Sequence, residues 1–350
     1  MVKGLTVLPA QHLLEVCAYL NGSKNLTPCE ETTFSSPHSN YVDLNEVSGQ
    51  AQGRRALEIA AAGEHSLLLC GPPGTGKTML ASRLPSILPP LTDQEALEVA
   101  AIMSIGGHGF TIKTWRQRPF RSPHHTASSI ALVGGGSSPR PGEISLAHHG
   151  VLFLDELPEF KRHVLEALRE PLESGNITIS RATQQVTFPA KFQLIAAMNP
   201  CPCGYYGDNR HQCCCTMTQI NRYRQRISGP LLDRIDLHIQ MAPISHKLLL
   251  QQQQSNESSA VVQKRVQQAR QWQQQRGKVN ATLSHKDLQS MVKLSTKQQR
   301  WLQAAIEKLN LSVRSYHRVL RVARTIADLA NQQAITQQHL AEALSYRPHY

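Results

Sequence analysis

The chain has 350 residues, of which 40% are hydrophobic and 18% charged, which is typical of a globular protein with room for two domains. The sequence has no apolar run of the roughly 18 residues that a membrane-spanning helix needs, and its N-terminus lacks the apolar core of a secretory signal. These features exclude a membrane protein by sequence and predict a cytoplasmic one.

The formal net charge of +12 is unevenly distributed along the chain. Residues 247–350 contain seven Lys and nine Arg against five Asp and Glu, a net charge of +11. A basic C-terminal region beside a nearly neutral N-terminal one indicates a polyanionic partner, most simply nucleic acid. Charge alone leaves open the alternative of a solvated helical face.

Short buried strands alternate with helices through the first two thirds of the chain, which predicts a parallel α/β sheet. Turn-forming residues predict a linker before this region. In chain order we predict a helix over 13–20, a linker over 21–40, a strand over 66–70, a helix over 77–84, a strand over 151–155, a helix over 161–174, a β-hairpin formed by 177–180 and 186–188, and a strand over 192–198.

The sequence changes character from residue 255 onward. It is rich in glutamine and poor in strand signals, and apolar residues recur at helical spacing near 301–309 and 319–326. This predicts an all-α domain over 255–350, separated by a glutamine run at 251–254 from an α/β domain over 41–245. Residues 1–40 are predicted to be an N-terminal tail and linker.

Residues 71–78 contain the strongest functional signal. Their sequence fits the phosphate-binding loop pattern in full and lies between a predicted buried strand and a predicted helix. Backbone N–H groups of such a loop surround the phosphates of ATP, its lysine neutralises their charge, and its last hydroxyl ligates magnesium. We therefore predict an ATP–magnesium site formed by Gly71, Pro72, Pro73, Gly74, Thr75, Gly76, Lys77 and Thr78.

Polar residues also end two of the other predicted strands. Asp155 lies at the carboxyl end of a central strand, where ligands bind in open α/β sheets, and it is predicted to hold the magnesium. Glu156 is predicted to be the general base that activates the attacking water. Asn199 is predicted to hydrogen-bond the γ-phosphate or this water, and the alternative is a turn-forming Asn before Pro200.

Longer strings accompany these motifs, at residues 43–50, 120–126, 141–150, 197–204 and 229–236. Together with the phosphate loop and the acidic pair, they resemble the magnesium-chelatase-like branch of AAA+ ATPases, and within it the ComM-type (YifB-type) family of bacterial competence proteins. The resemblance covers roughly residues 1–347. Members of that family usually carry a Lon-type N-terminal domain, of which we expect only the tail here, in residues 1–27.

The resemblance implies a fold and a function. The fold is a P-loop AAA+ domain, a parallel sheet with helices on both faces and β-hairpin insertions, followed by an all-α lid. The function is that of an ATP-dependent homo-hexameric ring that encloses single-stranded and branched DNA and acts as a helicase, promoting branch migration during natural transformation and homologous recombination. The alternatives are a chelatase-type ATPase that remodels a protein partner, and a DNA-binding scaffold without ATP hydrolysis.

Two arginines acquire roles only through this resemblance. Arg234 matches the arginine finger that reaches the ATP of a neighbouring subunit, and Arg314 matches the sensor-2 arginine of the lid. The resemblance leaves open whether Arg314 acts in its own subunit or across the interface. Without it, both are more simply interpreted as surface arginines on helices.

The five cysteines between residues 201 and 215 indicate a metal site. Two C-x-C pairs on tight turns are able to form a tetrahedral zinc site, which four protein ligands would make structural. The family pattern implies Cys201, Cys203, Cys213 and Cys215 as ligands, with His211 as a possible substitute. Reduced structural thiols are the alternative.

Two insertions are candidates for contact with DNA. One covers residues 105–147 and contains Arg121; the other is the hairpin of residues 175–190, with Arg181 near its tip and Lys191 at its base. In related rings these segments project into the pore, where arginines contact phosphates without discriminating between bases. A solvated loop and a plain hairpin are the alternatives. The histidine pairs at 124–125 and 148–149 suggest a second metal site, but we favour one buried and one exposed histidine in each pair.

Overall fold

The structure is a computed structural model. It describes residues 6–28, 41–107, 109, 111, 114–136, 139–180, 185–243, 256–309 and 311–347. Arg181, the turn of the predicted hairpin and most of the predicted linker at 21–40 lie outside these residues.

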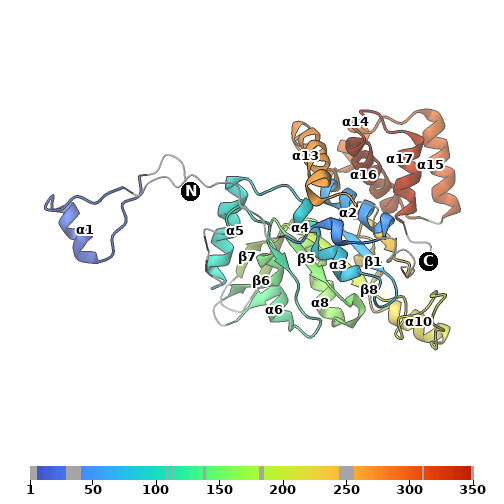
Figure 1. The fold of residues 1–350 in the computed structure, drawn as a ribbon, viewed down its shortest axis with the longest axis horizontal. Coiled ribbons are helices and arrows are strands. Elements are labelled where there is room, and N and C mark those ends of the chain that lie inside the picture. Colours follow the sequence, from blue (N-terminus) through green and yellow to red (C-terminus); the bar gives the residue numbers. More distant parts are fainter. Residues whose placement is uncertain are drawn as a thin grey trace.

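A five-stranded parallel sheet forms the centre of the molecule (Figure 1). Its strand order is β2-β5-β8-β1-β9. The chain therefore passes from β1 to the far side of the sheet and returns, so that β1 lies between two strands that follow it much later. The strands are β1 (Leu67–Cys70), β2 (Phe120–Arg121), β5 (Val151–Leu154), β8 (Gln193–Met198) and β9 (Leu237–Gln240).

The central strands are apolar throughout because both faces of the sheet are covered. In β1, Leu67 and Leu69 join one hydrophobic cluster, while Leu68 and Cys70 point to the opposite face and join another. The first cluster includes side chains from α2 (Ala51–Gly63), α3 (Lys77–Ser82) and α4 (Leu84–Ile87). The second includes side chains from α6 (Ser129–Val133), α7 (Glu143–Leu146), α8 (Arg162–Ala167), α10 (Met217–Arg224) and α11 (Gly229–Leu232).

Two insertions interrupt this α/β pattern. The first contains α5 (Asp93–Ile105), which starts with a capping box between Thr92 and Glu95, then α6 and a two-stranded ladder of β3 (Gly134–Gly135) and β4 (Arg140–Pro141). The second is the antiparallel hairpin of β6 (Asn176–Ser180) and β7 (Gln185–Pro189), which confirms the predicted hairpin strands.

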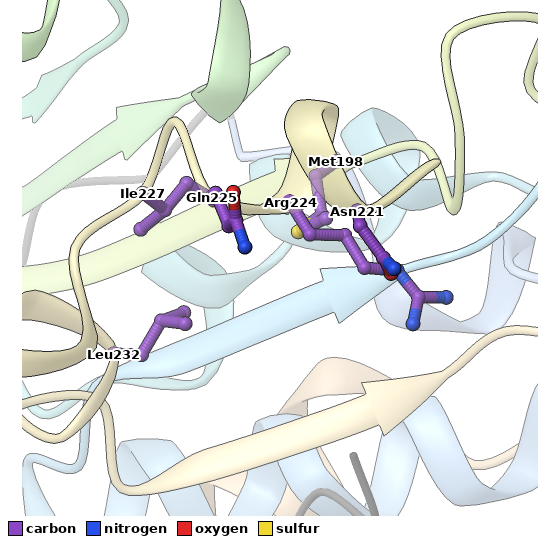
Figure 2. Close-up of a pocket in the computed structure, with 6 residues that line it drawn as sticks. All are labelled: Met198, Asn221, Arg224, Gln225, Ile227 and Leu232. Atoms are coloured by element: carbon purple, nitrogen blue, oxygen red, sulfur yellow. The ribbon is translucent and has the colours of Figure 1, made fainter. Parts of the chain in front are cut away.

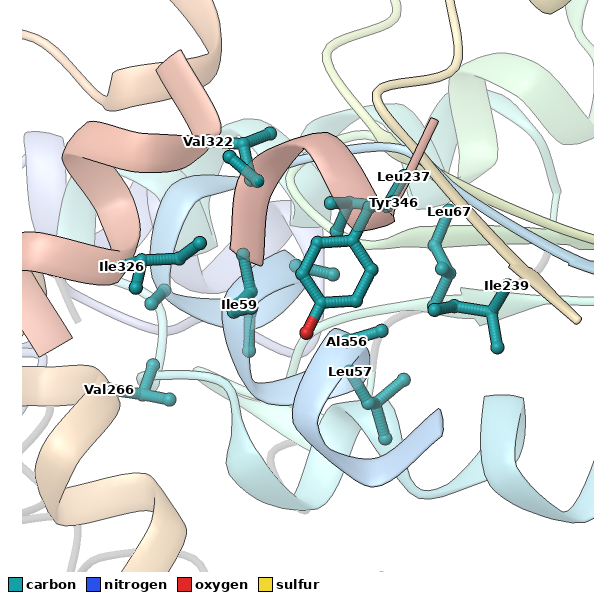
Figure 3. Close-up of a cluster of buried hydrophobic side chains, with 14 of the residues drawn as sticks. Ala56, Leu57, Ile59, Leu67, Leu237, Ile239, Val266, Val322, Ile326 and Tyr346 are labelled. Carbon is teal, nitrogen blue, oxygen red and sulfur yellow. The ribbon is translucent and has the colours of Figure 1, made fainter. Parts of the chain in front are cut away.

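The C-terminal region is helical, as predicted. Its helices are α13 (Ser259–Gln275), α14 (His285–Met291), α15 (Thr296–Lys308), α16 (Val313–Leu329) and α17 (Gln337–Ser345). Val266 of α13 and Val322 and Ile326 of α16 pack in one buried cluster with Ile59 of α2 and Leu237 of β9 (Figure 3). The lid and the α/β part thus share one hydrophobic core.

Two predictions about helices need comment. The helix predicted over 161–174 is divided at Leu168 into α8 and α9 (Arg169–Ser174), because Pro171 lacks an N–H and its ring would clash with the carbonyl of Ala167 in a continuous helix. The first helix, α1 (Leu13–Leu20), forms as predicted but has no buried residue and lies apart from the body in Figure 1. Among the described residues, no helix combines the length and apolarity needed to cross a bilayer.

Candidate active site

The predicted catalytic residues meet at one edge of the sheet. β5, β8 and β1 are adjacent and parallel, so their carboxyl ends lie together. The phosphate loop follows β1, the acidic pair Asp155 and Glu156 follows β5, and Asn199 follows β8. These residues are far apart in the sequence, and the sheet order brings them to one place.

The phosphate loop has the backbone shape that its glycines permit. Gly74 and Gly76 have φ values of +74° and +84°, in the left-handed region that disfavours side chains. The Thr75 hydroxyl donates to the carbonyl of Pro72 at 2.9 Å inside the loop. From outside, the amide of Gln50 donates to the Thr75 carbonyl at 3.1 Å and so holds the loop against the segment before α2.

Lys77 is buried and has only neutral hydrogen-bond partners in this loop. Its Nζ donates to the carbonyls of Gly71 at 2.7 Å and Pro72 at 2.9 Å and to Oδ1 of Asn199 at 3.1 Å. Burial lowers the pKa of Lys77, and the nearby Asp155 carboxylate opposes this shift. A buried ammonium group that touches only neutral acceptors, at the start of a helix, suits an anionic ligand such as a polyphosphate.

The carboxylate of Asp155 is oriented by two donors. The Thr78 hydroxyl donates to Oδ2 at 2.6 Å, and the backbone N–H of Glu156 donates to Oδ1 at 2.9 Å. A hydroxyl and a carboxylate are the hard oxygen ligands that Mg²⁺ prefers. The donor set therefore fits the predicted metal.

Glu156 adopts an unusual backbone conformation. Its φ of +53° and ψ of +46° lie in the left-handed region, which costs free energy for a residue with a side chain. Its carboxylate is about half exposed, and Oε2 lies 3.1 Å from Nδ1 of His125. Sequence reasoning had mentioned His125 only as half of a histidine pair, because nothing in its local pattern indicates a contact with a residue 31 positions later.

The two arginines predicted from the family pattern lie elsewhere within this chain. Arg234 follows α11, where it donates to the Pro230 carbonyl at 2.7 Å and pairs with Glu173 of α9. Arg314 is exposed in the first turn of α16. Their predicted roles at a nucleotide stay predictions, and that of Arg234 requires a second subunit.

The four predicted cysteine ligands converge at one point. Their sulfur atoms all lie within 4.8 Å of one another. Three of the separations are 3.3 Å, 3.5 Å and 3.7 Å, close to the edge of about 3.8 Å that a tetrahedron with Zn–S bonds of about 2.3 Å would have. A hydrogen bond from the backbone of Tyr205 lowers the pKa of Cys203 to about 5, and the thiolate is the form that binds metal. Cys214 is exposed, as expected of the residue between two ligands.

The cysteine loop touches the nucleotide loop. Gly204, with φ of +87°, lies so close that a Cβ atom there would be 2.8 Å from Cδ of Pro73 and 3.9 Å from Cγ of Asn199. On its other side, the Arg224 guanidinium of α10 lies over the ring of Tyr206 at 5.5 Å. A cavity of about 320 Å³ lies beside this helix (Figure 2), lined by Met198, Asn221, Arg224, Gln225, Ile227 and Leu232.

The second histidine pair contacts an acid but does not suit a metal. His148 and His149 both point a ring nitrogen at Oε2 of Glu98, at 3.2 Å and 2.8 Å. The other ring nitrogen of His148, Nδ1, accepts a hydrogen bond from the N–H of Lys191 at 3.0 Å, so the proton of the neutral ring is on the nitrogen that faces Glu98. A metal-binding histidine has the opposite arrangement, because it donates from its outer nitrogen.

This contact also locates the predicted DNA-binding residues. Lys191 lies at the base of the hairpin, and its backbone is held on both sides, because its carbonyl accepts from the N–H of His149 at 2.6 Å. Arg121 forms two hydrogen bonds with the carboxylate of Glu143, at 2.5 Å and 2.6 Å. Contact of Arg121 with DNA therefore has to compete with an intact ion pair and stays a prediction.

Much of the positive charge of the lid is engaged within the protein. Arg270 is buried and bonds the carbonyl of Ala61 and the carboxylate of Glu64. Arg265 bridges Glu58 and Glu257 at 2.6 Å and 2.7 Å. The surplus of basic residues therefore stabilises the junction of lid and α/β part, and the charge free to meet a polyanion is smaller than the sequence count.

A buried polar cluster that sequence reasoning missed lies at the same junction. Asp236 precedes β9 and accepts hydrogen bonds from Nη1 of Arg318 at 2.5 Å and Nδ1 of His65 at 3.0 Å. The other nitrogen of His65 lies 2.7 Å from the hydroxyl of Thr325. Despite its burial, the Arg318 guanidinium and the bond from His65 hold the pKa of Asp236 well below its usual range.

A parallel sheet of this order, a phosphate loop facing an acidic pair and a polar strand end, and a following helical lid define a P-loop protein of the AAA+ class. Comparison with known proteins assigns the chain more closely. Residues 43–249 match the model of the family described as magnesium chelatase, subunit ChlI, and residues 256–347 match that of its C-terminal domain. The chain belongs to this magnesium-chelatase family, in its ComM/YifB-type branch.

Individual relatives support this assignment. The chain is 52% identical to competence protein ComM of Haemophilus influenzae over 97% of its own length and 67% of that protein. It is 51% identical to the uncharacterized protein YifB of Escherichia coli over 99% of its length and 68% of that protein. A magnesium-chelatase 67 kDa subunit of Heliobacterium mobile is 26% identical over 46% of this chain and 28% of that subunit. The chain thus spans about two thirds of the ComM and YifB proteins.

Proposed function

We propose that this protein hydrolyses ATP and uses the energy as a hexameric DNA motor, a helicase that promotes branch migration during natural transformation and homologous recombination in the cytoplasm. We further propose that residues 41–245 and 255–350 are its ATPase and lid domains. The observation that carries the proposal is the meeting of Lys77, Thr78 and Asn199 with Asp155 and Glu156 at the carboxyl edge of the sheet.

These residues divide the chemistry between them. Lys77 would neutralise the phosphates, Thr78 and Asp155 would hold magnesium, and Glu156 would take a proton from water. Bound magnesium would supply positive charge to the phosphoryl oxygens. Asn199 already hydrogen-bonds Lys77 and would orient the same groups. Arg234, held beside Glu173, would complete the site of a neighbouring subunit, which supports a ring.

The DNA part of the proposal has separate support. One relative is named a competence protein, and the hairpin of β6 and β7 projects from the segment that joins the acidic strand β5 to β8. Arginine contacts to phosphates would tolerate any base sequence, which suits a motor that moves along DNA. Arg181, Lys191 and Arg121 are the residues we propose for these contacts.

The decisive experiment measures ATP hydrolysis with and without single-stranded and branched DNA. We expect DNA to stimulate the parent protein, Arg181→Ala to lose most of the stimulation while keeping its basal rate, and Glu156→Gln to bind ATP without turnover. Because Arg265 and Arg270 are engaged internally, the control that reduces lid charge is Lys264→Ala with Lys297→Ala, both of which are exposed. Absence of DNA stimulation would contradict the motor and favour an ATPase that remodels a protein partner.

We also propose that Cys201, Cys203, Cys213 and Cys215 hold a structural zinc. The near-tetrahedral grouping of their sulfur atoms supports this. Because Gly204 packs against Pro73 and Asn199, such a zinc would rigidify the turn that borders the phosphate loop. With four protein ligands it would have no open position for water and no part in the chemistry.

A further inference from the structure

We propose that His125 is the positioning residue for the general base: through its Nδ1–H it fixes the carboxylate of Glu156 in the orientation needed for attack by water. The inference rests on the proposed ATP hydrolysis and names a residue in the chain segment between β2 and α6 that acts through Glu156. Its central observation is the 3.1 Å contact between Nδ1 of His125 and Oε2 of Glu156.

The two residues are brought together by the sheet. β2 pairs in parallel with β5, with Phe120 opposite Val151 and Arg121 opposite Leu152. Both strands therefore end at the same edge, and the segments that leave them run side by side. His125 follows β2 and Glu156 follows β5, so the register of one strand pair places the imidazole next to the carboxylate.

His125 is itself held firmly. It occupies a hydrogen-bonded turn in which the N–H of Ala127 donates to the carbonyl of His124 at 2.9 Å, and Ser128 caps α6 directly afterwards. Its ring lies 4.1 Å from that of His124 and meets the edge of the buried Phe160 at 6.4 Å. An anchored ring is a suitable support for a mobile carboxylate.

The contact also specifies what each group does. An ionised carboxylate only accepts, so Nδ1 of His125 is the donor and Oε2 of Glu156 the acceptor. One carboxylate oxygen is thus anchored and the other stays free to accept a proton from water. The left-handed backbone of Glu156 makes this anchor more important, because the strained main chain and one side-chain bond together fix the direction of the group.

The alternative is an incidental surface ion pair, since about half of the Glu156 side chain and somewhat less than a third of the His125 side chain are exposed. Such pairs contribute little to stability and would have no effect on turnover. The two interpretations differ in what happens to kcat when Nδ1–H is removed and then restored by another donor.

The test compares His125→Ala with His125→Asn, whose amide nitrogen is able to occupy the position of Nδ1. We expect His125→Ala to lower kcat by about tenfold with KM and nucleotide affinity unchanged, because only the base loses its alignment. His125→Asn should recover most of the rate. His163→Ala, which removes an exposed histidine on α8, is the matched control and should equal the parent.

A double-mutant cycle shows whether His125 acts through Glu156. In the Glu156→Gln background, His125→Ala should cause no further loss. If Glu156→Gln itself hydrolyses ATP at the parent rate, the proposed function fails at its base. If Glu156→Gln is inactive while His125→Ala matches the parent, or while His125→Asn is as slow as His125→Ala, only the inference about His125 is overturned.

A spectroscopic readout tests the contact without turnover. In protein with ¹⁵N-labelled histidine, the resonance that disappears in His125→Asn belongs to His125. We expect it to have the signature of a ring protonated at Nδ1 and to shift in Glu156→Gln. A ring protonated only at Nε2, or a resonance unchanged by Glu156→Gln, would show that the hydrogen bond does not form in solution.

Discussion

The nucleotide edge of the sheet and the junction between sheet and lid use polar groups in opposite ways. At the edge, the Lys77 ammonium has only neutral acceptors and the Glu156 carboxylate is half exposed. At the junction, Asp236 is buried and accepts from both Arg318 and His65. The first region keeps binding capacity in reserve for a ligand, and the second uses its capacity to hold two parts of the chain together.

The comparison teaches where replacement should damage folding and where it should damage function. A buried charge with a partner cannot lose that partner without leaving a desolvated charge behind. A buried charge without a charged partner has already incurred that cost, so its removal relieves the fold while it deletes a contact with the ligand. Stability and activity should therefore respond separately in the two regions.

The largest expected effect on stability comes from Asp236→Asn. It leaves Arg318 buried without a counter-charge, and we expect a loss of roughly 3 to 5 kcal/mol in the free energy of unfolding, measured with denaturant. Asp233→Asn, three residues earlier in the same string, should cost under about 1 kcal/mol. Lys77→Ala is the reciprocal test, since it should leave the unfolding free energy unchanged or higher while abolishing ATP binding. A strongly destabilised Lys77→Ala protein would break the comparison.

Zinc, if bound as proposed, makes the cysteine loop a third region in which ligand and fold are inseparable. Elemental analysis should find about one zinc per chain, and a chelator should lower the melting temperature by several degrees, because metal binding is coupled to local folding. Cys213→Ser should reproduce the effect of the chelator, whereas Cys214→Ser, at the exposed neighbouring position, should not. Metal content well below one per chain would leave the loop as a cluster of reduced thiols.

The smallest effect is a dependence of stability on mild acid. Burial and the neighbouring His149 lower the pKa of His148 to about 4, and burial and Arg347 lower that of His238 to about 4. Histidines in the unfolded chain titrate near pH 6.5, so between about pH 6.5 and 4 the unfolded state binds more protons and stability falls as the pH falls.

Unfolding curves measured across that range should show the decline. His238→Gln keeps a donor for the carbonyl of Ile235 and removes one titrating group, so its stability should decline less steeply with acid. His163→Gln on the exposed face of α8 should follow the parent. An identical slope for His238→Gln and the parent would mean that His238 does not contribute.

Much of the fold followed from local sequence. The strands at β1, β5 and β8 are short apolar runs, and α16 shows its apolar spacing plainly, so these elements were predicted nearly to the residue. The division of the helix at Leu168 was missed, because one proline was outweighed by a long helical pattern. The insertion helices α6 and α7, with five and four residues, are too short to show any periodicity.

The candidate site divides along the same line. The sequence by itself determined Gly71–Thr78, Asp155 with Glu156, and the grouping of cysteines, because a loop that surrounds phosphates, or a turn that presents two thiolates, needs particular residues at fixed short spacing. Only the tertiary structure decided that His125 contacts Glu156, that Asp236 joins Arg318, and that Arg270 neutralises Glu64 within the fold. These pairs are separated by tens to hundreds of residues, and their geometry depends on strand register and helix packing, which no local pattern encodes.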